Sequence, residues 1–528
     1  MLIHFPRFKT ILVLILFSIS TGIVYASEQT EMLPEVNPDA VNNQPTSENT
    51  ALSEAKGLIM LDYSVIPVPG FKSLDLHGIH FLHQMNDWLY LGLGLHAPLF
   101  HGNSGGFMVF DATAHAQRRI LGNSFINAGV SFGGGGGGPT PQLSKQVSGT
   151  GGFIKAYMGL GYDFRSFSVG ANYAHYKFIN SRINSSQLNL FIQKPLSYSI
   201  GSYANSGNEI EYDPSLSESG GDNMITLELN NIFQIKPKGT HKNTINSLSL
   251  QFSHFLTDNY YLFILGEAGY YGLPIYNHIL GGVGYKLPVS PRISIFGQIG
   301  VGSGGYSPDR IDTGPGLLVY PKFSLEYLLN NNYGLSLSGG YLVAPMGTSK
   351  NFTVGLAMNI YQSTKERMQS NSSAEKNLVY QGFRVNVFQQ TEFNVQIGSR
   401  KHPNIKMLSG QFDYIVNDYW YIPAQVSFAY TAYNGGPGYG EILTGLGIQS
   451  KYSTTNPFQG FLQVLLGGGA HGVLLKPSVG FNYGLTDHLA LYGQVAKTLS
   501  IKAPVNKRFR ASSAGLGLTY RFSSLNSQ

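Results

Sequence analysis

Apolar and polar residues alternate with a period of two along most of the chain after about residue 57. Between 473 and 483, one face carries Val473, Leu475, Pro477, Val479, Phe481 and Tyr483, and the other carries Leu474, Lys476, Ser478, Gly480 and Asn482. A period of two indicates β-strands. The alternating segments run for about 9 to 13 residues, which is long for soluble proteins and suits strands tilted across a bilayer.

Eight such segments follow one another in the middle of the chain. They cover approximately 224–236, 244–256, 260–272, 278–288, 293–303, 315–329, 333–345 and 351–361. Short turns, such as the one at Thr257-Asp258-Asn259, alternate with longer connections, such as the one from Tyr306 to Gly314. Short turns on one side and longer loops on the other are typical of a transmembrane β-barrel, with both ends of the unit on the periplasmic side.

A polar turn followed by an aromatic-rich strand occurs three times. The turns begin at Asn86, Thr257 and Asn417, 171 and 160 residues apart, and a glycine-rich stretch follows each (133–138, 302–305 and 467–469). This spacing indicates three copies of one unit of roughly 165 residues. The predicted order is repeat 1 (57–203), a linker (204–223), repeat 2 (224–361), a linker (362–377), repeat 3 (378–522) and a tail (523–528).

The N-terminus has the pattern of a secretory signal peptide. Arg7 and Lys9 precede an apolar run from Thr10 to Val24, and Val24-Tyr25-Ala26 is a small-x-small cleavage site. We expect residues 1–26 to be removed on export. Residues 27–56 are polar and lack periodicity, so a disordered lead-in is expected there.

The composition agrees with strands that face lipid. Only 12% of the residues are charged and 13% are aromatic, whereas about a quarter of a soluble protein's residues are charged. The chain has no Cys, which excludes disulfides, thiol chemistry and an N-terminal lipoprotein anchor. The net charge of +6 becomes +4 without Arg7 and Lys9. That mild bias fits contact with anionic lipid headgroups, and the lack of long basic runs argues against nucleic-acid binding.

These features resemble the bacterial outer-membrane β-barrel proteins as an architecture, over residues 57 to 522. The last alternating segment carries Leu516, Leu518, Tyr520 and Phe522 on one face, which resembles the C-terminal signal that such barrels present to their assembly machinery. Six residues follow Phe522 here, whereas the family usually ends on the aromatic residue. The resemblance implies a cell outer-membrane location, with outer-membrane lipid and the barrel-assembly machinery as partners.

The fold class is therefore all-β, with transmembrane antiparallel barrels in three tandem repeats. Eight strands are enough for a small barrel filled by side chains. The two connections between repeats are much longer than the periplasmic turns, which favours three small barrels over one barrel of about 24 strands. A six-bladed propeller is a further alternative, although its strands are usually shorter.

Aromatic residues just after the short turns predict membrane-interface girdles. They are Trp88, Tyr90, Tyr260, Tyr261, Tyr419, Trp420 and Tyr421.

The first repeat is rich in histidine, and the strand pattern turns His80, His96, Asp111 and His115 inward together. Imidazole and carboxylate groups suit a transition metal such as Zn²⁺. The ligand spacing is loose and the other repeats lack the cluster, so a polar barrel interior is the favoured interpretation. We expect no metal and no cofactor. The glycine run at 133–138 lacks the Lys-Ser/Thr ending of a phosphate-binding loop.

The favoured function is a non-enzymatic surface or structural role in the outer membrane. The first alternative is a porin-like channel or export conduit, which needs a wider barrel. A barrel-embedded lipid-modifying hydrolase is a weaker alternative, since no convergent Ser-His-acid set is evident in the sequence.

Overall fold

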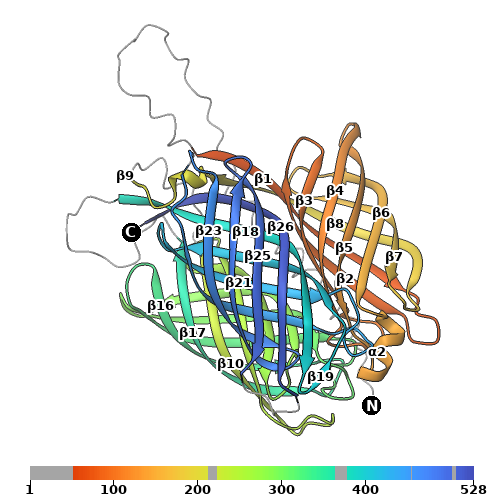
Figure 1. Cartoon of the computed structure of the whole chain (residues 1–528). Coiled ribbons are helices and arrows are strands. Elements are labelled where there is room, and N and C mark those ends of the chain that lie inside the picture. Colours follow the sequence, from red (N-terminus) through yellow and green to blue (C-terminus); the bar gives the residue numbers. More distant parts are fainter. Residues whose placement is uncertain (1–51, 212–222, 363–376, 454, 502–506, 528) are drawn as a thin grey trace, which may run out of the picture.

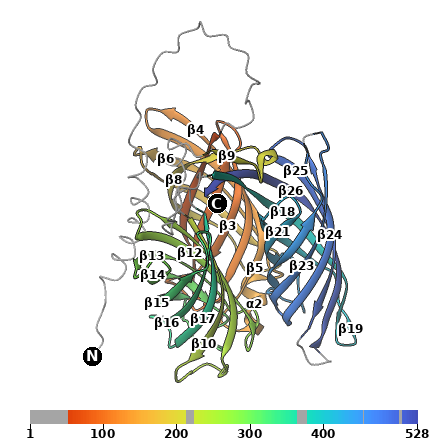
Figure 2. The same ribbon diagram turned by 90° about the vertical axis from the view of Figure 1, so that its left-hand side faces the viewer.

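The computed structural model describes residues 52–211, 223–362, 377–453, 455–501 and 507–527. The expected signal peptide and most of the lead-in lie outside these residues, as does much of each expected linker. Within the described residues the chain forms three closed antiparallel barrels of eight strands each (Figures 1 and 2). No described helix is long and apolar enough to cross a membrane.

Barrel 1 closes where its first strand pairs with its eighth, for example Tyr63 with Leu190. Its strands are β1(Ser53–Ile66), β2(Leu74–Gln84), β3(Leu89–Ala97), β4(Met108–Leu121), β5(Ser124–Gly136), β6(Gly152–Asp163), β7(Ser168–Phe178) and β8(Asn184–Ile200). The helix α2(Pro141–Ser148) lies between β5 and β6, and the side chain of Thr140 caps its N-terminus. The short helix η2(Tyr203–Asn205) follows β8.

Barrel 2 closes between β10 and β17 in the same way. Its strands are β10(Asn223–Gln234), β11(Ile245–Phe255), β12(Tyr260–Tyr271), β13(Asn277–Pro288), β14(Ile293–Gly305), β15(Leu317–Leu328), β16(Tyr333–Val343) and β17(Lys350–Gln362). These bounds lie within two residues of the segments predicted from the alternation, because lumen-facing and wall-facing side chains set the period.

Barrel 3 closes between β18 and β26. Its strands are β18(Asn377–Ile397), β20(Ile405–Ile415), β21(Trp420–Ala429), β22(Gly440–Gln449), β23(Phe458–Gly469), β24(Gly472–Gly484), β25(Leu489–Ser500) and β26(Phe509–Ser527). Two short strands, β9(Glu209–Glu211) and β19(Arg400–Lys401), pair with β18. The prediction of three small barrels is confirmed, and the described strands form neither a 24-stranded barrel nor a propeller.

Two boundaries differ from those expected. β1 begins at Ser53, inside the expected lead-in, because Ser53 to Lys56 pair with the end of β8. β26 continues beyond Phe522 to Ser527, because β18 is long enough to offer those residues a partner. The residues expected to form a C-terminal tail therefore extend the wall of barrel 3.

The outer walls are apolar and the lumens are polar. Along β26, Leu516 and Leu518 point outward and are exposed, while Thr519 and Arg521 point inward and are buried. Large exposed apolar side chains cover the outside of all three barrels, for example Met158, Leu356 and Leu446. Such continuous apolar surface is unusual for a soluble monomer and typical of a lipid-facing wall.

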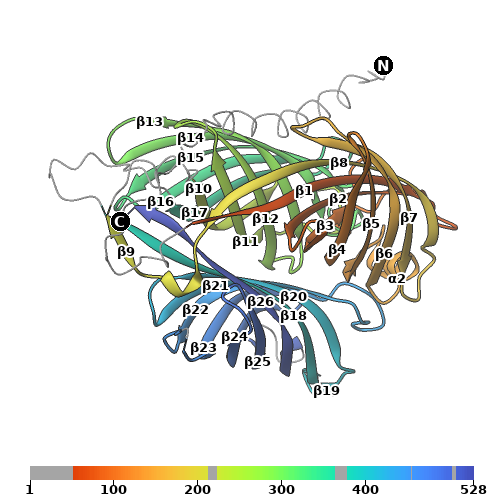
Figure 3. The same cartoon turned by 90° about the horizontal axis from the view of Figure 1, so that it is seen from above.

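The three barrels lie side by side in a closed ring (Figure 3). In every pair, the glycine-rich end of one barrel's fifth strand meets the end of another's third strand. Gly134 of β5 meets Ala429 of β21, Gly468 of β23 meets Tyr270 of β12, and Ser303 of β14 donates a hydrogen bond of 2.5 Å to the carbonyl of Pro98, which follows β3. Each contact joins different surfaces, and three such contacts close the ring, as in a cyclic trimer.

The barrels can approach this closely because the glycines at the contacts have no side chains. A Cβ atom added at Gly134 would lie 2.6 Å from the carbonyl carbon of Ala429, and one added at Gly468 would lie 2.7 Å from Cβ of Tyr270. The glycine-rich stretches that mark the repeat in the sequence are therefore where the barrels touch. We call the side of each barrel that carries these contacts and the longer connections the loop end, and the opposite side, with the short turns and β9, the linker end.

Candidate functional site in the barrel lumens

A lysine–carboxylate pair crosses the lumen of every barrel between equivalent strands. The lysine lies on the sixth strand and its partner on the first: Lys155 with Asp62, Lys322 with Glu228, and Lys476 with Glu392. The first and sixth strands are not neighbours in the barrel, so each pair spans the interior. Both members of each pair are buried.

In barrel 1, the pair belongs to a network that includes two histidines. Lys155 Nζ lies 2.5 Å from Asp62 Oδ2, and His80 Nε2 lies 3.0 Å from the same oxygen. His96 Nε2 lies 3.1 Å from Asp111 Oδ2. The hydroxyl of Thr113 donates to Asp111 at 2.6 Å. These polar groups stabilise one another in the centre of the lumen, where charge without a partner would be costly.

Barrel 2 contains three buried polar clusters. Glu228 accepts hydrogen bonds from Lys322 and from the hydroxyl of Ser338. On the loop-end side, Glu267 lies 3.2 Å from His278 Nε2 and accepts from Ser247.

Nearer the linker end of barrel 2, Glu326 accepts hydrogen bonds of 2.6 Å from both Asn359 and the hydroxyl of Tyr361. Buried polar groups therefore occupy this lumen at several levels.

In barrel 3, Lys476 lies between two carboxylates. Its Nζ is 3.4 Å from Glu392 and 2.8 Å from Glu441 on β22. Nearer the linker end, Arg384 Nε donates to Asp413 at 3.0 Å and the guanidinium lies 4.6 Å from the ring centre of Tyr421.

A tyrosine at the same place in each repeat projects into the lumen near the linker end. Tyr261 donates to Gln298 at 2.9 Å, Tyr421 donates to Gln463 at 3.0 Å, and the ring of Tyr90 lies 6.0 Å from that of His115. Tyr261 and Tyr421 are each 1% exposed. The expectation that Tyr90, Tyr261 and Tyr421 form part of an interface girdle is therefore corrected, because adjacent strand residues face opposite sides.

The other girdle residues point outward next to the turns. Trp88, Tyr260, Tyr419 and Trp420 are between 50% and 59% exposed. Each turn is held by the same local bonds: the side chain of Asn86, Thr257 or Asn417 accepts from the backbone N–H groups two and three residues later. This is a turn motif that Asn and Thr favour.

All four residues singled out for a metal in repeat 1 point into the lumen. Asp62, which the sequence did not suggest, joins His80 and His96 to form a set whose ligand atoms lie within 4.8 Å of one another. Lys155 already lies against Asp62 and supplies positive charge there. His115 Nδ1 instead lies 2.8 Å from the hydroxyl of Tyr157. The geometry favours an ionic network over an ion-binding cage.

Other histidines of repeat 1 lie elsewhere. His77 and His101 lie beside Asp75 at the loop end, 3.6 and 3.9 Å from its carboxylate. His83 bonds to Tyr198 at the linker end. The histidine-rich composition of this repeat therefore does not mark one common centre.

One Ser-His pair lies on the outer wall of barrel 1. His175 Nδ1 is 2.8 Å from Ser186 Oγ. Within the described ranges no carboxylate bonds to His175 to orient it, and the neighbouring strand backbone pairs along the ladders between β6, β7 and β8. The pair therefore lacks the third group and the oxyanion donors that acyl-transfer catalysis uses.

The alternation placed Lys476 and Asn482 on the same face of their segment, but it did not single out the lysine pairs. The signal that could have found them is a lysine flanked by apolar or aromatic residues within the sixth alternating segment, as in Ile154-Lys155-Ala156 and Pro321-Lys322-Phe323.

No protein-family model and no curated protein matches this chain. Among solved structures, a variant of the ferric enterobactin receptor from Pseudomonas aeruginosa is 10% identical, with a TM-score of 0.28 over 90% of this chain and 81% of that one. The outer membrane protein Ail of Yersinia pestis is 11% identical, with a TM-score of 0.19 over 27% and 100%. A bacterial polysaccharide outer membrane secretin is 10% identical, with a TM-score of 0.24 over 89% and 98%.

Proposed function

We propose that the protein is a non-enzymatic outer-membrane protein whose three sealed barrels hold a set of loops at the cell surface. The observation that carries this proposal is the lysine–carboxylate pair across each lumen. Eight strands enclose a space that side chains can fill, and here buried polar networks occupy it. The lumens therefore offer no aqueous path for a solute.

The outer surface supports a location in the membrane. Large apolar side chains cover it, and the ionisable groups described above within the barrels are ion-paired or hydrogen-bonded, as expected at membrane depth. The proposed lipid environment also explains why exposed aromatic residues lie beside the turns. We further propose that the outward side chains of Leu516, Leu518, Tyr520 and Phe522 serve as the signal for the barrel-assembly machinery.

The connections at the loop end are the surface available to the exterior. Barrel topology places all of them on the side opposite the short turns and β9 (Figure 1). The ring of glycine contacts holds three sets of loops next to one another. Such an arrangement suits a rigid surface platform better than three independent anchors.

Because the chain has no Cys, single substitutions can report which end is outside. Thr240→Cys lies in the connection between β10 and β11, and Asp258→Cys lies in the turn between β11 and β12; both positions are exposed. We expect a membrane-impermeant maleimide to label Thr240→Cys in intact cells and Asp258→Cys only after lysis. Labelling of Asp258→Cys in intact cells, or failure to label Thr240→Cys there, would contradict the proposed orientation.

A further inference from the structure

The loop end of the barrels is strongly basic. Its connections carry the exposed residues Lys72, Lys145, Arg182, Lys236, Lys238, Lys242, Arg310, Arg400, Lys401, Lys507 and Arg508. The described carboxylates in the same connections, Asp309 and Asp312, accept hydrogen bonds from Ser307 and Thr348 instead. The turns at the linker end mix both signs: Asp87, Arg165, Asp258, Arg292, Asp418, Lys451 and Asp487. Positive charge therefore accumulates on one side of the membrane.

On barrel 1, two of these cations, Lys72 and Arg182, lie in loop-end connections, and a third, Lys177, lies one residue from the end of β7. The guanidinium of Arg182 donates to the carbonyl of Pro69 at 3.0 Å and lies 5.4 Å from the ring centre of Phe71. This places Arg182 beside the connection that carries Lys72. Lys177 projects from the outer face of β7 just below, and no described carboxylate forms an ion pair with any of the three. These exposed cations are available to an anionic ligand.

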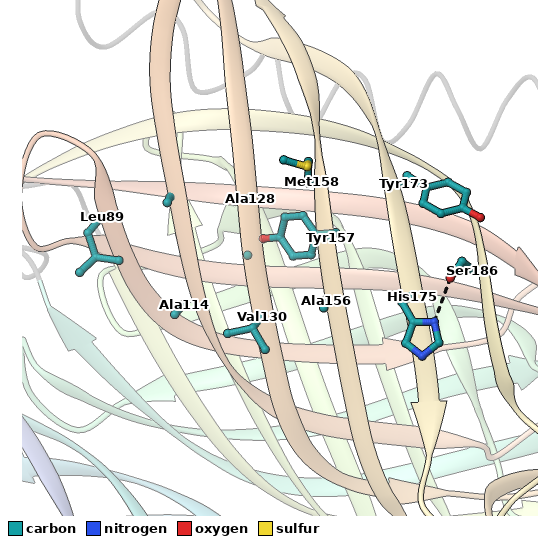
Figure 4. A pocket seen from close by; sticks show the side chains of 12 residues that line it. Leu89, Ala114, Ala128, Val130, Ala156, Tyr157, Met158, Tyr173, His175 and Ser186 are labelled. Atoms are coloured by element: carbon teal, nitrogen blue, oxygen red, sulfur yellow. Dashed lines mark hydrogen bonds between the residues drawn. The ribbon is translucent and has the colours of Figure 1, made fainter.

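A groove of about 550 Å³ lies in the outer wall of the same barrel. Its floor is formed by small residues of β4, β5 and β6, among them Ala114, Ala128, Gly129 and Ala156 (Figure 4). The buried ring of Tyr157 occupies the space that a side chain at Gly129 would fill. Because this wall faces lipid, the groove has the shape and polarity to take an acyl chain.

Polarity changes in order from the groove to the loops. Met158 and Tyr173 flank the apolar part, and the hydrogen-bonded pair of His175 and Ser186 lies at its edge (Figure 4). Lys177 follows two residues farther along β7, which is about 7 Å of strand, and Arg182 lies beyond the strand end. The apolar groove therefore suits an acyl chain, the His175–Ser186 pair suits the polar linkage of a lipid, and Lys177 and Arg182 suit its anionic headgroup.

We propose that the outer wall of barrel 1 binds one lipid whose phosphate-bearing headgroup has a net negative charge. Its acyl chain lies in the groove, and its phosphate contacts Lys177, Arg182 and Lys72. The proposal rests on the membrane location proposed above, since the wall meets lipid only if the barrel is inserted. Positive charge near a membrane surface attracts anionic lipid, so three cations suffice for clear selectivity.

Spin-labelled lipids test this in nanodiscs of phosphatidylcholine, whose two leaflets are identical, so that orientation is irrelevant. The probes are spin-labelled phosphatidylglycerol and spin-labelled phosphatidylcholine, and the readout is the immobilised fraction. We expect the full chain to prefer phosphatidylglycerol, and Lys72→Gln/Lys177→Gln/Arg182→Gln to reduce that preference about tenfold. The matched control, Lys56→Gln/Arg165→Gln, removes exposed cations from the linker end of the same barrel and should keep most of the preference.

A second pair of variants separates a lipid from a free anion. Ala128→Leu/Ala156→Leu fills the groove without changing charge, and should also weaken phosphatidylglycerol binding. If this variant binds as well as the native chain while inorganic phosphate, but not chloride of equal ionic strength, displaces the probe, the site holds a free anion and the lipid proposal is wrong. Equal immobilisation of both probes by the native chain would overturn it as well.

Insertion is checked first by the heat-dependent shift in gel mobility of folded barrels. If the protein does not insert, that result contradicts the proposed membrane function and leaves the lipid site to be judged separately.

Discussion

Replacing Lys476 by Met lowers the free energy of unfolding of barrel 3 by about 3–5 kcal/mol. Lys476 is the cation between Glu392 and Glu441, and all three side chains are fully buried or nearly so. Its loss leaves two carboxylates close together without a counter-charge. Since the two tryptophans are Trp88 and Trp420, urea unfolding in a Trp88→Phe background follows barrel 3 through Trp420.

Two variants provide controls for this measurement. Lys497→Met removes an exposed lysine from the wall of the same barrel, where it bonds only weakly to Ser512 at 3.2 Å, and should change stability little. Lys476→Met combined with Glu392→Gln and Glu441→Gln removes the unpaired charges and should recover much of the loss. If Lys476→Met were as stable as Lys497→Met, the lumen networks would not hold the barrel together.

Adding a side chain at a glycine contact between two barrels should drive those barrels apart. Gly468→Val places a side chain against Tyr270 and the carbonyl of Gly269, and Gly134→Val places one against Ala429 and Tyr430. We expect each variant to separate one pair of barrels without unfolding either, at a cost of about 1–3 kcal/mol. Spin labels on Thr240→Cys and Lys401→Cys would show a longer and broader distance distribution between barrels 2 and 3 in Gly468→Val.

Gly266→Val is the matched control, because an added Cβ at this outward position of β12 meets no atom within 4 Å. Its distance distribution should equal that of the native chain. An unchanged distribution in Gly468→Val as well would show that the glycine contacts do not set the arrangement of the barrels.

The periodicity of the chain was sufficient to predict the strands, their number and their separate closure. Alternation reports directly on a wall with one lipid-facing side and one lumen-facing side. The long connections between repeats indicated that each repeat closes alone, and the pairing of β1 with β8, of β10 with β17 and of β18 with β26 confirms it.

The girdle prediction was wrong for Tyr90, Tyr261 and Tyr421 because it was based on distance from the turn and ignored which face each residue occupies. Tyr260 and Tyr261 are the same residue type and both follow the turn directly, but Tyr260 points outward and Tyr261 points into the lumen. Keeping strict parity from the turn would have placed these tyrosines in the lumen.

The remaining features depend on contacts between distant segments. Lys155 and Asp62 are 93 residues apart, and their pairing follows from the curvature of the barrel, which the sequence pattern does not report. The glycine-rich stretches were recognised as part of the repeat, but their role as contacts becomes visible only when the position of the neighbouring barrel is known. The same holds for the groove, since its floor comes from several strands.

Single-channel conductance of the refolded residues 27–528 in planar bilayers tests the proposal that side chains seal the lumens. We predict well-inserted protein without conductance steps, because paired and hydrogen-bonded side chains cross every lumen. Large, stable conductance steps would contradict sealed lumens and show that the protein forms a channel.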